Sequence, residues 1–92
     1  MTTKKRDRLE VIYDILSIIR DHKNSMRSTP LLRYANLSSK TFSEYFSELL
    51  NKDLVRETMD KKGIKYLSLS DKGFLYLEKY KLIIGFINEF EL

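Results

Sequence analysis

The apolar residues near the N-terminus repeat with the period of a helix. In "RDRLEVIYDILSIIRDH", Leu9, Ile12, Leu16 and Ile19 are separated by alternating steps of three and four residues, which places them on one side of a helix. The segment "HKNS" that follows lacks this period and is predicted to end the helix. The next three residues, "MRS", are enough for only a short strand.

A short second helix is predicted for "PLLRYA". Thr29 is a residue type that caps helices, and Pro30 is of the type tolerated best at the first helical position. Asn36 is expected to end this helix, because asparagine accepts the left-handed backbone conformation found at many helix ends.

The third periodic segment lies within "YANLSSKTFSEYFSELLNKDLV" and has one apolar and one polar side. Ser38 or Ser39 is expected to cap it by accepting a hydrogen bond from a backbone N–H. The apolar stripe follows the spacing i, i+3, i+4, i+7, i+8 and consists of Phe42, Tyr45, Phe46, Leu49 and Leu50. The opposite side, rich in hydroxyl and charged residues, is therefore predicted to face away from the core.

After Asp53 the pattern changes to that of strands. "LVRETM" and "IKYLSLS" are short β-favouring runs, and "DKKG" between them contains Gly63, which can adopt the positive φ that such a loop usually needs. These segments predict a β-hairpin with lysines at its tip.

Ser70 is expected to cap a last helix, "DKGFLYLEKYKLIIGFINEFEL". This helix carries more apolar side chains than one face of a small domain can cover, so one face is predicted to cover its own domain and another to bind a partner. The predicted partner seam has spacings of 4, 3, 4 and 3 and consists of Tyr76, Tyr80, Ile83, Ile87 and Phe90. The seam predicts a homodimer, and its residues leave open whether the two helices run parallel or antiparallel.

Together these elements predict a mainly helical α+β fold with one small hairpin. Residues 1–70 form a helix-turn-helix followed by a wing, and residues 71–92 form a C-terminal dimerisation helix within the same structural unit. With 92 residues, the chain has the length of one domain and buries only a moderate core, which adds to the expectation of a partner.

The charge of the chain is positive and unevenly distributed. There are 17 Lys and Arg against 13 Asp and Glu, for a net charge of +4 and a pI of about 9.3. Residues 71–92 hold three basic and four acidic residues, which leaves 14 basic and 9 acidic residues, or +5, in residues 1–70. This distribution favours a polyanionic partner for the first 70 residues. The basic arm "KKRDR" is a further candidate for phosphate contact.

Several other kinds of site have little support. The chain contains no cysteine, which excludes disulfides, thiolate zinc sites and cysteine nucleophiles. Glu44 and Glu48 lie four residues apart, but no histidine or third carboxylate accompanies them in sequence to build a metal or acid–base site. His22, the one histidine, is interpreted as a polar partner for a helix end. We therefore predict no enzymatic activity, no cofactor, no metal and no small-molecule substrate.

The order of elements resembles a known family, the small winged-helix chromatin proteins of Sulfolobus-type archaea and related archaeal predicted regulators. The segments that carry the resemblance are "RLEVIYDILSII", "ANLSSKTFSEYFSELLNKDLV" and "YLSLSDKGFLYLEKYKLIIGFI". The resemblance covers nearly the whole chain and implies dimerisation through the C-terminal helix as an antiparallel coiled coil.

The resemblance also implies which residues contact DNA. The third helix would enter the major groove and the hairpin would reach phosphates or the minor groove. The implied contacts are Ser38, Ser39, Lys40, Ser43, Glu44 and Ser47 in and before the third helix, and Lys61, Lys62 and Lys65 in the wing. Because Lys40 is the one cation on that helix face, we expect binding led by phosphates, with weak sequence preference.

The sequence therefore predicts a homodimeric protein that binds double-stranded DNA, either as a chromatin-associated architectural protein or as a transcriptional regulator. No apolar run is long enough to span a bilayer, so we expect a cytoplasmic, nucleoid-associated protein without membrane partners. The alternative is a winged helix used only for protein–protein contact, since the same fold hosts both functions. The target sequence and the direction of any regulation cannot be predicted from these residues.

Overall fold

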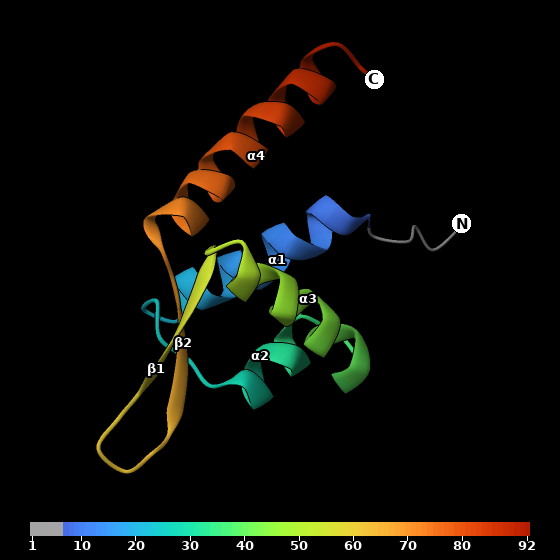
Figure 1. The fold of residues 1–92 in the computed structure, drawn as a ribbon. Coiled ribbons are helices and arrows are strands. Elements are labelled where there is room, and N and C mark those ends of the chain that lie inside the picture. The colour runs from blue at the N-terminus through green and yellow to red at the C-terminus, as the bar shows by residue number, and fades with distance from the viewer. Residues whose placement is uncertain (1–6) are drawn as a thin grey trace.

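The computed structural model describes residues 7–92, which form a helix-turn-helix, a two-stranded hairpin and a long final helix (Figure 1). The residues "KKR" of the basic arm, 4–6, lie outside the described part. The elements in chain order are α1 (Arg8–Asp21), α2 (Ser28–Tyr34), α3 (Ser39–Asn51), β1 (Val55–Met59), β2 (Lys65–Leu69) and α4 (Asp71–Glu89). This is the mainly helical winged arrangement that the sequence predicts.

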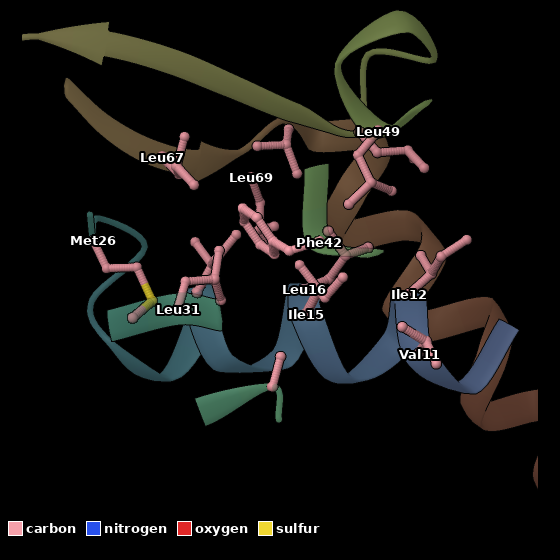
Figure 2. Close-up of a cluster of buried hydrophobic side chains, with 14 of the residues drawn as sticks. Val11, Ile12, Ile15, Leu16, Met26, Leu31, Phe42, Leu49, Leu67 and Leu69 are labelled. Carbon is pink, nitrogen blue, oxygen red and sulfur yellow. The ribbon is translucent and has the colours of Figure 1, made fainter. Parts of the chain in front are cut away.

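The core is built around α1, as Figure 2 shows. Ile15, Leu16 and Ile19 of α1 are fully buried, and they meet Leu31 of α2 and Leu49 of α3. The hairpin closes this core from a further side, with the buried residues Leu54, Val55, Leu67 and Leu69. Each large apolar side chain buried in this way contributes about 1.5–3 kcal/mol relative to exposure. The alternation of apolar and polar residues thus fixes which face of each element turns inward.

Serine side chains cap the two helices for which the sequence predicts them. The Ser38 hydroxyl accepts a hydrogen bond from the Thr41 N–H at 3.2 Å, so α3 begins at Ser39. The Ser70 hydroxyl accepts from the Gly73 N–H at 3.1 Å and donates to the Asp53 carbonyl at 2.5 Å. Of the two cap candidates for α3, Ser38 is therefore the one used.

The predicted start of α2 is wrong. Thr29 is not its cap: α2 begins at Ser28, with Arg27 as an N-cap that makes no side-chain hydrogen bond. The cause is tertiary, because Met26 pairs with Leu67 of β2 through two backbone hydrogen bonds, of 2.7 and 3.1 Å. This pairing holds the chain extended up to Arg27, and the helix starts directly afterwards. The predicted end is confirmed, since Asn36 adopts a φ of 57°.

The hairpin extends from the body of the domain as a wing. Its strands are antiparallel, with Val55 opposite Leu69 at the base and Met59 opposite Lys65 at the tip. Gly63 in the connecting loop has a φ of 81°, as the sequence predicts. The wing and α4 leave the body in opposite directions (Figure 1), which gives the molecule its elongated extents of 50 × 29 × 22 Å.

The first half of α4 packs against α1 of the same chain. The Tyr76 hydroxyl donates to the Leu9 carbonyl at 2.8 Å, and the Tyr80 ring stacks on Tyr13. These two tyrosines belong to the predicted partner seam, so this part of the prediction requires correction: they cover their own domain. The periodicity of a helix that is apolar on several sides does not reveal which side crosses α1.

A different side of α4 is left uncovered. Leu75, Leu82 and Phe86 follow the spacing i, i+7, i+11, which places them on one side of the helix, and they are 48%, 64% and 56% exposed. Ile83 and Phe90 of the predicted seam border this side and are also exposed, whereas Ile87 is half-buried. We call Leu75, Leu82, Ile83, Phe86 and Phe90 the outer stripe. Within residues 7–92, no helix is both long and apolar enough to cross a membrane.

Candidate nucleic-acid interface

The outer side of α3 forms a shallow, open groove. Its lining residues are all exposed, and they are Ser39, Lys40, Ser43, Glu44 and Ser47. These residues face outward because Phe42 and Leu49 point into the core from the opposite side of the same helix. Five of the six predicted contact residues of this region are thus brought together. The sixth, Ser38, lies at the helix start, where its hydroxyl caps α3 and also bonds to the Thr41 hydroxyl at 3.0 Å.

The charge of this groove is balanced, with one lysine and one glutamate among three serines. Glu48, one turn further along α3, is held in ion pairs with Arg8 and with Lys52, the latter at 2.8 Å. Serine hydroxyls both donate and accept, so they fit several base edges as well as phosphate oxygens. The chemistry of the groove therefore favours contact with little base discrimination.

The wing presents a cluster of lysines on a loop of defined shape. The Asp60 carboxylate accepts hydrogen bonds from the N–H groups of Lys62 and Ile64, at 2.8 and 2.9 Å, and the Gly63 N–H donates to the Asp60 carbonyl at 3.0 Å. Lys61, Lys62 and Lys65 are exposed around this loop. Asp60 is the one carboxylate of the loop 60–64, and because one of its oxygens accepts from two backbone donors, the three ammonium groups dominate what the wing tip offers to a partner.

The α3 groove and the wing lysines are two separate clusters. The hairpin tip and α3, which carry them, lie apart in Figure 1, with the tip at one end of the domain and α3 on the other side of its base. The chain passes from α3 directly into β1, so the two clusters are held by one continuous segment. A partner that contacts both must therefore be extended.

Two further exposed cations lie on α2 and were not predicted from the sequence. Arg27 and Arg33 are exposed at the start and in the last turn of α2. Arg27 directly follows Met26, which pairs with Leu67 in the middle of β2. The sequence feature that could have indicated them is the pair of basic residues at the two ends of the short helix before α3. Basic side chains near a DNA-recognition helix commonly contact phosphates.

The chain belongs to the winged helix-turn-helix family, whose sequence model matches residues 5–87. A curated relative, the uncharacterized protein MJ0290 of Methanocaldococcus jannaschii, is 32% identical over 83 residues. The match covers 90% of this chain and 36% of that protein, so the chain spans about a third of the length of this relative.

Solved structures of the same fold include Sso10a-2, a DNA-binding protein from Sulfolobus solfataricus. It superposes with a TM-score of 0.76 at 17% identity, covering 94% of this chain and 86% of that one. The PcaV transcriptional regulator from Streptomyces coelicolor gives a TM-score of 0.73 at 20% identity, over 86% of this chain and 59% of its own. F93 from STIV, a winged-helix DNA-binding protein, gives 0.72 at 20% identity, over 87% of this chain and 91% of that one. The likeness confirms the fold and the family resemblance inferred from the sequence.

Proposed function

We propose that this protein binds double-stranded DNA as a homodimer, and that it acts as a chromatin-associated architectural protein or a transcriptional regulator. The observation that carries the proposal is the wing, where Lys61, Lys62 and Lys65 surround a loop fixed by Asp60. A preshaped loop of exposed ammonium groups is suited to the regular charges of a phosphate backbone. No cofactor, metal or enzymatic step is part of this proposal.

Binding is expected to depend mainly on phosphates. Arg27 and Arg33 add exposed cations at the two ends of α2, whereas the α3 groove offers one lysine and three hydroxyls. Strong base selection usually relies on bidentate Arg, Lys, Asn or Gln contacts. The α3 groove therefore contributes orientation and modest sequence preference, while the wing and α2 provide most of the affinity.

The second half of the proposal is a dimer formed through the outer stripe of α4. Its five large apolar side chains are 48–64% exposed. Complete burial of such a side chain contributes about 1.5–3 kcal/mol, so covering the exposed part of each would contribute about half of that. A second copy of α4 is the simplest cover, and two linked domains raise the apparent DNA affinity if both reach one duplex. The antiparallel arrangement is implied by the family resemblance alone.

The proteins with similar structures support DNA binding as the general function. Sso10a-2 and F93 are named as DNA-binding proteins, and PcaV is named as a transcriptional regulator. Their fold is shared over most of this chain, and the proposed place of action is accordingly the nucleoid. A winged helix used only for protein contact is the alternative, and the charge-balanced α3 groove and the outer stripe are the observations that favour it.

The test is a gel-shift titration of the protein with several unrelated duplexes at two salt concentrations. The proposal predicts binding of all duplexes, with affinities within about tenfold of one another and a steep decrease at the higher salt. Failure to bind any duplex at low salt would reject DNA binding and leave the protein-contact alternative.

A further inference from the structure

A cavity of about 250 Å³ lies where α1, α3 and α4 meet, and none of its lining residues lines the α3 groove or belongs to the wing. Its floor is apolar and consists of Ile12, Leu49 and Leu54, which are 4%, 0% and 7% exposed. Ligand sites of drug-sized molecules usually measure about 300–1,000 Å³. This cavity therefore fits an organic molecule of about one ring.

The rim of the cavity is strongly cationic. It carries Arg8, Lys52 and Lys72 against the single carboxylate of Glu48. Glu48 pairs with both Arg8 and Lys52, whereas Lys72 makes no ion pair within residues 7–92. An excess of two positive charges stands over an apolar floor. A cation would be repelled here, and a strongly hydrated inorganic ion would gain nothing from the floor.

Tyr76 forms one wall of the cavity, and its hydroxyl is directed to the Leu9 carbonyl at 2.8 Å. Burial raises the pKa of Tyr76 to about 12, with a smaller contribution from Tyr80, while Arg8 acts in the opposite direction. The phenol is therefore neutral near pH 7, and the wall adds no negative charge that would repel an anion.

We propose that this cavity binds a small organic anion, a carboxylate attached to one aromatic ring or a branched aliphatic body. The carboxylate lies at the rim, where it pairs with Lys72 and competes with Glu48 for Arg8. The ring covers Ile12, Leu49 and Leu54. Because Leu49 belongs to α3 and Lys72 to α4, such a ligand would contact both helices.

The experiment uses benzoate as the probe and benzamide as its neutral counterpart of the same shape. Each is titrated into ¹⁵N-labelled protein, and the amide shifts are followed by NMR. Benzoate is expected to shift the amides of Ile12, Leu49 and Leu54 in a saturable manner, and benzamide to bind at least about tenfold more weakly, since a hydrogen bond to a charged group contributes about 1.5–3 kcal/mol. Equal affinity for both probes, or no saturable shift, would overturn the proposal.

Three variants test whether benzoate binds in this cavity. Lys72→Gln is expected to reduce benzoate affinity about tenfold, and Lys79→Gln, on an exposed position of α4 outside the cavity, to leave it unchanged. Leu9→Trp at the half-exposed mouth should fill the cavity and abolish binding without a decrease in thermal stability. Equal decreases from the two lysine variants, or retained binding in Leu9→Trp, would assign benzoate to another site. No DNA is used, so these outcomes are independent of the proposed DNA function.

Discussion

The rings of Tyr13 and Tyr80 stack with their centroids 4.6 Å apart and their planes inclined by 26°. This contact, with the Tyr76 hydroxyl bonded to Leu9 one turn earlier, fixes how α4 crosses α1. Aromatic pairs of this kind contribute about 0.5–1.5 kcal/mol beyond their buried area. The crossing decides which apolar side of α4 serves the monomer and which side remains for a partner.

The first prediction concerns the outer stripe of α4. Leu82→Lys combined with Phe86→Lys is expected to convert a dimer into a monomer in analytical ultracentrifugation and to weaken DNA binding, because charges in the interface prevent the outer stripe from being covered. The control is Glu78→Gln combined with Glu89→Gln, which adds the same two units of positive charge to exposed positions outside the stripe. Wild-type protein that sediments as a monomer at high micromolar concentration would contradict the dimer.

A second prediction tests the wing. Lys61→Glu combined with Lys62→Glu should weaken binding to every duplex by a similar factor. The slope of log affinity against log salt should become shallower by about 0.9 for each phosphate that the wing no longer neutralises. Lys79→Glu combined with Lys81→Glu makes the same charge change on α4 and should alter affinity much less. If both double variants weaken binding equally, net charge rather than the wing determines affinity.

A third prediction concerns Glu44, the carboxylate in the α3 groove. Removing a negative charge that faces the phosphate backbone should preserve or increase nonspecific affinity, so Glu44→Ala is expected to bind unrelated duplexes at least as tightly as the wild type. Gel-shift titrations on a panel of duplexes measure this. A large decrease confined to one sequence would instead make Glu44 a specific contact, for example with cytosine N4.

The fourth prediction compares two glycines of α4. A Cβ added at Gly73 would lie 2.3 Å from the Leu54 carbonyl oxygen and 3.3 Å from the Leu69 Cβ, whereas a Cβ at Gly85 meets nothing within 4 Å. Gly73→Ala is therefore expected to lower the free energy of unfolding by about 1–3 kcal/mol, and Gly85→Ala to raise it by up to about 1 kcal/mol. Urea denaturation at equal protein concentration gives both values, and similar effects of the two changes would contradict this packing.

The fifth prediction is a decrease of stability in alkali. The Tyr76 phenol has a folded-state pKa of about 12, raised from an ordinary value of about 10. Between these values the unfolded chain releases this proton while the folded chain keeps it, so the free energy of unfolding falls as the pH rises. Tyr76→Phe should have a shallower decline from pH 9 to 12 in denaturant titrations. A decline as steep as that of the wild type would assign the pH dependence to other tyrosines.

Local signals predicted the parts of the fold that depend on neighbours in sequence. The stripe that includes Phe42 and Leu49, the cap at Ser70 and the turn at Gly63 each follow from spacing or from the properties of one residue type. The start of α2 could not be predicted in this way, because it depends on pairing between Met26 and Leu67, 41 positions apart in the chain.

The candidate sites also differ in whether they depend on neighbours in sequence or on tertiary packing. The outward-facing residues of α3 could be predicted as a set because they share one helix face, and the lysines because they lie in or directly after one turn, while their role as DNA contacts was implied by the family resemblance. The cavity beneath Lys72 and the outer stripe depend on how α4 crosses α1, and no period within α4 encodes that angle. Which residues of a helix apolar on several sides face outward is a property of the packed molecule.

Ser70 is the one residue between the end of β2 and the start of α4, and its hydroxyl joins the Asp53 carbonyl to the Gly73 N–H. The strand that carries the wing therefore continues into the helix without a hinge. If two copies are joined through α4, their wings stand at one fixed separation, and only duplex positions matching that separation can be occupied by both at once. Inserting one or two glycines after Ser70 would relax this geometry while leaving in place every side chain proposed to contact DNA.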